Sequence, residues 1–353
     1  MVPRRGTGVS ESGTGAGRRA ENNVVSLASK RSESSSMLAE GEALETLRAA
    51  LDDLRREIRT QLPRPGADAE AQAKVPGRVD WFALFDELRV RLGHLGMRES
   101  SGEIDEFGMD FDLVERMRPL LDFLSEKYWR IDLRGDEHIP DAGPALYVAN
   151  RSGLLPYDGW MLAHLVEKIG GGDPRPHFMV DDDLMALPFL QPVLARAGGV
   201  LACPENAERL LASGHSVVIF PEGMRGAIKT FDQRYELQGF GHHALLGAAS
   251  EAGVPIVPVG VVGAEETQPM LFRLYLVAWM MGLPFLPVTP TFPLLGPLGL
   301  LPLPSRWGVE FGQAVGPEFL AAEGGPERVM GHLRDRVRVL VDRGRALRPS
   351  PWT

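Results

Sequence analysis

The chain has 353 residues, 44% of them hydrophobic, so it can bury a sizeable core as one or two domains. Its formal net charge of −9 argues against non-specific binding to nucleic acid, which requires a basic domain. Cys203 is the only cysteine, which excludes an intrachain disulfide and a cysteine-rich zinc cluster. We predict no metal site.

The first 130 residues predict a tail followed by helices. Residues 1–36 are polar, low in complexity and without the apolar stretch of a secretory signal, so we expect a disordered tail. Residues 37–77 predict an amphipathic helix, with apolar side chains at three- and four-residue steps, and then a linker rich in Pro, Gly and Ala. Residues 78–130 predict a helical region with helices near 81–95 and 113–128.

Short apolar runs alternate with helical patterns from residue 131 to residue 348. The expected strands are 145–149, 178–180, 217–220, 256–262 and 309–311, and the expected helices are 159–168, 205–213 and 326–345. Such alternation favours an α/β fold, with a mixed, mostly parallel sheet flanked by helices. We therefore predict one α/β domain over residues 131–348, preceded by the helical region.

One long apolar segment, residues 274–305, contains no charged residue but seven prolines. Proline removes amide donors and clashes inside a helix, so this segment cannot form a regular membrane-spanning helix. We expect an apolar lobe that covers the functional site or dips into one leaflet of a membrane. Ordinary core or a lid is the alternative.

Two polar segments follow predicted strands: residues 150–158 begin Asn-Arg-Ser-Gly, and residues 220–226 begin Phe-Pro-Glu-Gly. Both lie at the carboxyl ends of strands, the usual place for a site in such sheets. In this order they resemble the active-site blocks of the glycerolipid and lysophospholipid acyltransferase superfamily, which includes the 1-acylglycerol-3-phosphate acyltransferases. Residues 254–259, Val-Pro-Ile-Val-Pro-Val, resemble a further block and look like the branch that contains diacylglycerol-type acyltransferases.

The first block departs from the family pattern at one decisive position. The family has a histidine as general base, separated by four residues from an aspartate that orients it. This chain has Arg151, and six residues separate it from Asp158. Arginine stays protonated and has no acceptor atom, so Arg151 cannot be a general base and is more naturally an ion-pair partner of Asp158.

Three interpretations of this departure remain open. The site is inactive and retains lipid binding, or another group serves as the base, or Arg151 binds a phosphate or thioester oxygen in a divergent enzyme. A replacement base is Asp158 itself or a histidine such as His242 or His243, although a structural role for this histidine pair is the alternative. Cys203 is expected to be a packing residue.

The second block implies a site for the acceptor. By resemblance, Glu222 and Gly223 shape a loop that holds glycerol or phosphate, because glycine lets backbone amides approach an anion. Arg225, Lys229 and Arg234 then add positive charge, unless they belong to a solvated basic loop.

The family's third block, a strand that ends in a phosphate-binding arginine, corresponds to residues 198–204. The arginine is absent there, which puts a glycerol-3-phosphate-type acceptor in doubt. Arg196 could compensate only if its side chain pointed inward.

Taken together, the resemblance implies transfer of an acyl chain from acyl-CoA or acyl carrier protein to a hydroxyl of a lysophospholipid or glycerolipid at the membrane surface. It implies no metal or redox cofactor and a cytoplasmic, peripherally membrane-associated protein. The predicted catalytic residues are Asp158 and Arg151, and the predicted substrate-binding residues are Asn150, Ser152, Glu222, Gly223, Arg225 and Lys229. The alternatives are a catalytically inactive lipid-binding or regulatory homologue and an acyl-thioester hydrolase.

Overall fold

The computed structural model describes residues 87–88, 104–141, 143–171, 175–187, 190–275, 278, 285–316, 319 and 325–348. The tail expected to be disordered, the expected amphipathic helix with its linker, and nearly all of the helix expected near 81–95 lie outside the described residues. Residues 77–353 form one compact unit.

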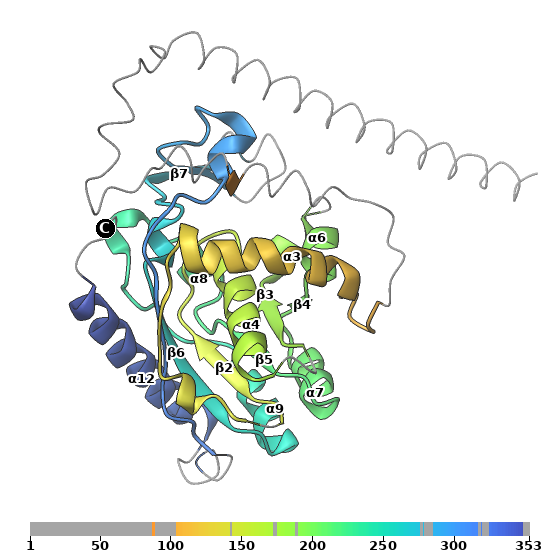
Figure 1. Cartoon of the computed structure of the whole chain (residues 1–353). Helices are drawn as coiled ribbons and strands as arrows, with labels where there is room; N and C mark the ends of the chain where they lie inside the picture. Colours follow the sequence, from red (N-terminus) through yellow and green to blue (C-terminus); the bar gives the residue numbers. More distant parts are fainter. Residues whose placement is uncertain are drawn as a thin grey trace, which may run out of the picture. The chain divides into compact units, whose positions relative to one another are not determined.

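A seven-stranded sheet forms the centre of this unit (Figure 1), in the order β1-β9-β6-β2-β5-β3-β4. Its strands are β1 (Asp132–Arg134), β2 (Leu146–Ala149), β3 (His177–Val180), β4 (Gly199–Leu201), β5 (Val217–Ile219), β6 (Ile256–Val262) and β9 (Gly308–Phe311). All neighbouring pairs are parallel except β6 and β9, which are antiparallel. The prediction of an α/β fold with a mixed, mostly parallel sheet is confirmed.

The central strands are buried on both sides, as expected for a parallel sheet covered by helices. Every residue of β2, β5 and β6 is buried. These strands could therefore be predicted from their continuous apolar runs in the sequence. The edge strand β1, by contrast, contains Asp132 and Arg134 and has no fully buried residue, so it lacked such a run.

Helices cover the two faces of the sheet separately. Tyr147 and Ala149 of β2 belong to a core shared with α3 (Phe111–Phe123) and α4 (Tyr157–Ile169). Leu146 and Val148, which alternate with them, belong to a second core. This second core contains side chains of α7 (Pro204–Ala212), α9 (Ala244–Ala252) and α12 (Pro326–Leu347).

The shorter helical elements lie mostly in the connections after the strands. They are η1 (Leu124–Tyr128), η2 (Asp136–His138), α5 (Asp182–Met185), α6 (Gln191–Arg196), α8 (Met224–Ala227), η3 (Phe231–Gln233), η4 (Ala264–Glu266) and η5 (Gly296–Leu300). The helix expected at 113–128 is therefore α3 followed by the π-helical turn η1. Directly after η1, the indole of Trp129 stacks on that of Trp307 with 4.2 Å between ring centroids.

The chain between β6 and β9 forms the expected apolar lobe. It contains an antiparallel pair, β7 (Phe272–Leu274) and β8 (Leu286–Val288), followed by η5. Among the described residues of the lobe, five large apolar side chains are exposed: Leu271, Phe272, Tyr275, Leu294 and Leu295. Within the described part of the chain, no helix is long and apolar enough to cross a membrane.

Candidate active site

The first block begins where β2 ends, and Asn150 fixes it to the neighbouring strand. The Asn150 side chain is fully buried; its Nδ2 donates to the carbonyl of Val261 at 2.9 Å, and its Oδ1 accepts from the amide of Val261 at 2.7 Å. Both ends of the carboxamide are thus satisfied by one residue of β6. Asn150 therefore fixes the start of the loop to β6.

Arg151 and Asp158 form a buried ion pair, as the sequence led us to expect. Arg151 Nη1 lies 2.5 Å from Asp158 Oδ1, and the two residues are 1% and 2% exposed. The amides of Ser152 and Gly159 also donate to this carboxylate, at 2.8 and 2.9 Å. Burial raises the pKa of Asp158, whereas Arg151 and these amides act in the opposite direction.

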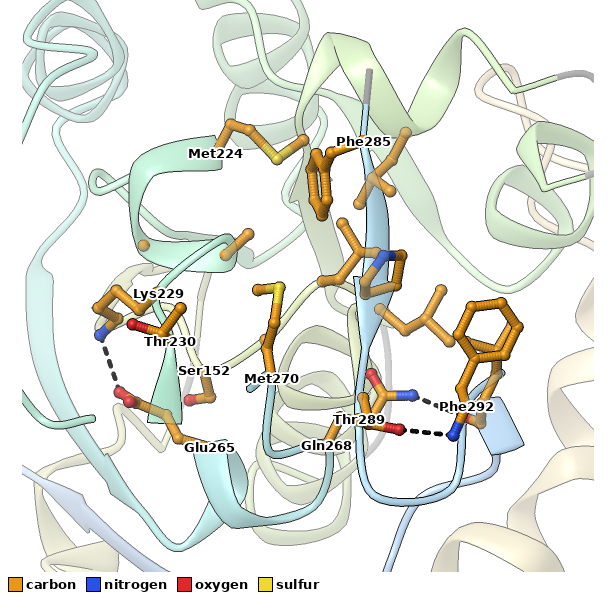
Figure 2. A pocket seen from close by; sticks show the side chains of 18 of the residues that line it. Ser152, Met224, Lys229, Thr230, Glu265, Gln268, Met270, Phe285, Thr289 and Phe292 are labelled. Carbon is orange, nitrogen blue, oxygen red and sulfur yellow. Dashed lines mark hydrogen bonds and ion pairs between the residues drawn. The ribbon is translucent and has the colours of Figure 1, made fainter. Parts of the chain in front are cut away.

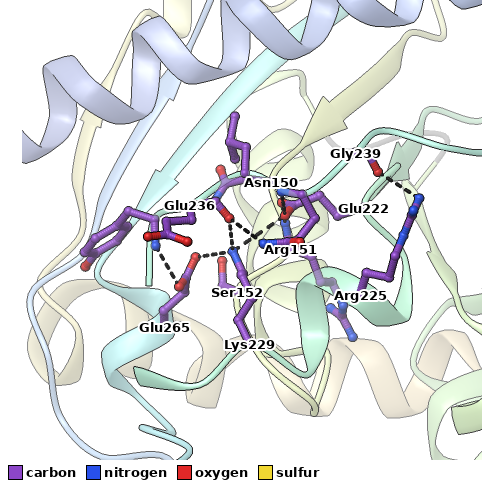
Figure 3. A network of polar contacts seen from close by, with 12 residues as sticks. Asn150, Arg151, Ser152, Glu222, Arg225, Lys229, Glu236, Gly239 and Glu265 are labelled. Atoms are coloured by element: carbon purple, nitrogen blue, oxygen red, sulfur yellow. Dashed lines mark hydrogen bonds and ion pairs between the residues drawn. The ribbon is translucent and has the colours of Figure 1, made fainter. Parts of the chain in front are cut away.

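Glu222 of the second block joins the two blocks. Its Oε1 accepts from the amide of Arg151 at 2.9 Å, and its Oε2 accepts from the amide of Gln238 at 2.8 Å. Lys229 Nζ lies 3.6 Å from the same Oε2 (Figure 3). The Glu222 carboxylate therefore links the two blocks, which lie about seventy positions apart in the sequence.

Lys229 extends this network to Glu265, which lies in η4 just after β6. Their side chains are buried and form an ion pair of 2.8 Å, and Glu265 Oε2 also accepts from the amide of Tyr235 at 2.9 Å. Burial raises the pKa of Glu265 to about 7, against the opposing effect of Lys229. Burial alone would lower the pKa of Lys229. The negative charges of Glu265 and Glu222 have a larger, opposite effect, and the pKa of Lys229 is raised.

Gly223 turns the second block tightly past two titratable side chains. Its φ of +57° and ψ of −149° suit glycine, and a Cβ there would lie 3.1 Å from both Asp181 Oδ1 and His242 Nε2. His242 is exposed and itself has a φ of +57°. Of the two replacement histidines considered from sequence, His242 therefore lies beside the block.

A cavity of about 540 Å³ opens next to these loops. Figure 2 shows Ser152, Lys229 and Glu265 together on one side of it, with Met224, Phe285 and Phe292 on the others. Most of the lining is apolar and comes from α5, α8 and the lobe. The cavity is the size of a small-molecule site and combines an apolar wall with a few polar groups.

Residues 152–155 of the first block line this cavity, and the one polar side chain among them is that of Ser152. Its Oγ is buried and has no hydrogen-bond partner among the described residues, while its amide is fixed by Asp158. On its other side, a hollow of about 10 Å³ is lined by Ser152, Asp158 and Trp307, among others. A buried hydroxyl without a partner is a candidate ligand-binding group.

The basic residues predicted for the acceptor site lie in different places. Lys229 and Arg234 line the cavity, whereas Arg225 is exposed and its Nη2 donates to the carbonyl of Gly239 at 3.0 Å. Arg196 pairs with Asp110 at 2.7 Å, so it does not compensate for the arginine missing from the third block.

Of the eight predicted site residues, the structure brings Asn150, Arg151, Ser152, Asp158, Glu222, Gly223 and Lys229 together at one end of the sheet and turns Arg225 aside. Glu265 was not assigned a role from sequence. The apolar strand β6 directly before Glu265 was a signal for it in the sequence. This strand ends at the same edge of the sheet as the two strands that precede the blocks.

No histidine is among the hydrogen-bond partners of Asp158 in the part of the chain that the structure describes. His164 on α4, for example, lies 3.1 Å through its Nε2 from Oδ1 of Asp122. The histidine–aspartate arrangement of the family is thus replaced here by arginine and aspartate.

Comparisons with known proteins agree with the two blocks. The profile of the acyltransferase family matches residues 130–262. The uncharacterized protein Rv0502 of Mycobacterium tuberculosis is 40% identical over 240 residues, which are 67% of each chain. The uncharacterized protein ML2427 of Mycobacterium leprae is 39% identical over 67% of this chain and 65% of its own.

Among solved structures, the 1-acyl-sn-glycerophosphate acyltransferase PlsC from Thermotoga maritima is similar with a TM-score of 0.44. It is 16% identical, and the match covers 76% of this chain and 94% of that one. With the family profile spanning both blocks and the mycobacterial relatives covering two thirds of the chain, this protein belongs to the acyltransferase family.

Proposed function

We propose that this lipid acyltransferase transfers an acyl chain from a thioester, acyl-CoA or acyl carrier protein, to a hydroxyl of a lysophospholipid or glycerolipid at a membrane surface. One observation carries the proposal: both motif blocks meet beside a single, largely apolar cavity of about 540 Å³. An apolar cavity excludes water, which favours transfer to a lipid hydroxyl over hydrolysis.

The proton of the attacking hydroxyl needs an acceptor in or beside this cavity. Arg151 has no acceptor atom, and neither Arg151 nor Asp158 lines the cavity. Glu265 lines the cavity and, with a pKa raised to about 7, is half ionised near neutral pH. We assign the role of general base to Glu265.

The reaction then balances with the residues present. The acceptor oxygen attacks the thioester carbonyl carbon while its proton passes to Glu265. The tetrahedral intermediate expels the thiolate, which takes up the proton held by Glu265, so the products are an ester and a free thiol and Glu265 is ionised again. Ser152 Oγ, which has no partner, donates to the carbonyl oxygen on which negative charge develops.

Arg151 and Asp158 have a positioning role in this proposal. Asp158 holds the amide of Ser152, and Arg151 holds Asp158, so the pair sets the place of the Ser152 hydroxyl at the cavity. Their predicted catalytic role thus becomes an indirect one, exerted through Ser152.

The lobe supports a membrane-surface location. Phe285 and Phe292 line the cavity, while Leu294 and Leu295 of the same lobe are 84% and 45% exposed. Exposed apolar side chains beside a lipid-sized cavity are suited to contact one leaflet. We propose a cytoplasmic protein that associates peripherally with the membrane through this lobe.

The test is acyl transfer by the purified full-length protein. Radiolabelled acyl-CoA and acyl carrier protein are offered with lysophospholipids, monoacylglycerol and diacylglycerol in mixed micelles, and labelled ester is measured. Wild type should form ester, and Asp158→Ala should abolish it. Glu251→Gln, at an exposed position on α9, is the matched control and should retain full activity.

The ion pair at Arg151 favours a second candidate, a lipid-binding homologue without activity. For that candidate, wild type would be silent with every donor and acceptor while Arg151→His gained activity. Release of free fatty acid without an acceptor would instead indicate a thioester hydrolase.

A further inference from the structure

We propose that the acceptor is an uncharged lipid alcohol, such as a diacylglycerol, and not a phosphate-bearing lipid such as lysophosphatidate. This inference rests on the proposed acyl transfer and narrows its substrate class. It follows from how the basic side chains around the cavity are already engaged.

A phosphate monoester has specific requirements of a binding site. It carries about −1.5 to −2 charges at neutral pH and is held by unpaired cations or by several amide donors. Taking such a charge out of water without compensation is strongly unfavourable. A lysophosphatidate site at this cavity therefore needs cationic side chains that are free to face it.

Arg151 is not free. Its Nη1 is bonded to Asp158, its Nη2 donates to the carbonyl of Leu154 at 3.3 Å, and its guanidinium lies over the ring of Phe220, 5.1 Å from the centroid. The residue is 1% exposed and does not line the cavity. Its charge is already neutralised within the fold.

Lys229 lines the cavity, but two neighbouring carboxylates outweigh its single positive charge. Its ammonium lies 2.8 Å from Glu265 and 3.6 Å from Glu222, and all three side chains are buried. Two carboxylates thus surround one cation. When both are ionised, an approaching phosphate meets a net negative charge at this side of the cavity.

Arg225 of the second block and Arg234, which follows the block, do not change this balance. Arg225 is turned toward the carbonyl of Gly239 and is absent from the lining. Arg234 lines the cavity but is exposed, bonded to the carbonyl of Phe231, and placed over that ring at 4.4 Å. Asp183 also lines the cavity and adds a carboxylate to its wall.

The remaining polar groups suit a neutral acceptor. Ser152, Thr230, Gln268 and Thr289 line the cavity with uncharged donors and acceptors, and the surrounding wall is apolar. Hydroxyls and amides can bond the hydroxyl and ester oxygens of a diacylglycerol without compensating a charge.

The experiment compares acceptors that share acyl chains but differ in the headgroup. Purified full-length protein is given one labelled acyl donor with dioleoylglycerol, 1-oleoyl-lysophosphatidate or 1-oleoyl-lysophosphatidylcholine, at equal mole fraction in neutral detergent. We expect kcat/KM to be at least tenfold higher for dioleoylglycerol than for lysophosphatidate. An equal or higher value for lysophosphatidate overturns this inference while leaving acyl transfer intact. Ester from none of the acceptors overturns both.

A charge-adding variant tests the stated cause. Thr230→Lys places an unpaired cation on the lining, and Thr230→Gln is its uncharged control. Relative to wild type, the ratio of lysophosphatidate to dioleoylglycerol turnover should rise at least tenfold in Thr230→Lys and stay within about twofold in Thr230→Gln. Retention of fluorescent lysophosphatidate by Thr230→Lys in a binding assay gives a readout independent of turnover. An unchanged ratio together with unchanged retention would show that charge does not select the acceptor.

Discussion

Arg151 fills the position in the first block where the family has a proton acceptor, and its surroundings show how the chain accommodates it. The guanidinium is buried against Asp158 and Phe220, and the backbone amide of the same residue bonds Glu222. With these three contacts, Arg151 stabilises the conformation of the loop. The acid–base chemistry therefore has to come from a neighbouring group.

The first prediction concerns this ion pair. Arg151→Met removes the cation and leaves Asp158 buried without its partner, which should lower the free energy of unfolding by about 3–5 kcal/mol. Chemical denaturation measures the change. Arg343→Gln, which breaks the partly exposed pair with Glu310, is the control and should cost less than about 1 kcal/mol. Asp158→Asn added to Arg151→Met should recover part of the loss, and no recovery would mean that charge burial is not the cause.

The second prediction concerns Glu265 and pH. Its pKa is raised by burial to about 7, and the base must be ionised to accept a proton, so kcat/KM should fall as pH drops through 7 and level off above it. The charged groups facing it are Lys229 and Glu222. Glu265→Gln should lower kcat/KM about 100-fold or more and abolish this pH dependence.

The matched control for Glu265 is Glu236→Gln, which changes an exposed carboxylate nearby. It should leave both the rate and the pH profile unchanged. If Glu265→Gln kept the wild-type profile, the titrating group would be another residue, with His242 beside Gly223 the next to substitute.

At the residue scale, sequence reasoning found the blocks but not all of the chemistry. The ion pair between Arg151 and Asp158 was predicted, because arginine beside an aspartate in one short loop has few other outcomes. The role of Glu265 was not, since its environment depends on Lys229, 36 positions earlier, and on burial that composition does not reveal.

At the scale of elements, the site depends on how neighbouring strands are joined at their carboxyl ends. Asn150 after β2 and Val261 in β6 exchange two hydrogen bonds across the sheet edge. Glu222 after β5 bonds the amide of Arg151 on the other side. The first block is thus fixed between both of its neighbours.

The third prediction tests this connection. Asn150→Ala leaves the amide and carbonyl of Val261 without these partners in a buried place, which should cost about 2–4 kcal/mol of stability. Thermal unfolding gives the measurement. The control is Asn206→Ala on α7, which removes one half-buried hydrogen bond to the carbonyl of Leu201 in β4 and should cost about 1 kcal/mol. Equal losses in the two variants would contradict a special role for Asn150.

The elements that sequence predicted best are those with continuous apolar runs. All five expected strands are present within a few residues, as are the helices expected at 159–168, 205–213 and 326–345. The short helices α5 and α6 were missed, since tertiary contacts and not local pattern stabilise helices of four and six residues. The strand pair β7–β8 was missed because prolines interrupt its alternation.

At the scale of the whole molecule, the lobe brings an exposed apolar surface next to the cavity. The chain leaves β6, builds the lobe, and returns as the antiparallel neighbour β9, so the lobe is anchored at both ends to adjacent strands. Sequence predicted the apolar lobe from composition. It could not predict the order of strands, because strand pairing depends on contacts far apart in the chain.

The fourth prediction tests membrane contact by the lobe. Wild type should cosediment with neutral phosphatidylcholine vesicles, and Leu294→Glu combined with Leu295→Glu should reduce the bound fraction about tenfold or more, since charged side chains do not enter the apolar leaflet. Val339→Glu changes a similarly exposed apolar residue on α12 and is the control, with unchanged binding. If Val339→Glu lost as much vesicle binding as the lobe variant, exposed apolar residues anywhere on the surface would contribute, and the lobe would have no specific role.

The stacked indoles of Trp129 and Trp307 give the site an optical readout. Trp307 lines the small hollow behind Ser152 and Asp158, and its Nε1 lies 3.1 Å from the hydroxyl oxygen of Thr267, next to η4. A substrate that shifts the first block alters the surroundings of this emitter. Stopped-flow fluorescence should therefore follow substrate binding before the ester forms, with Trp307→Phe as the control. Binding and turnover can then be measured separately without a labelled lipid.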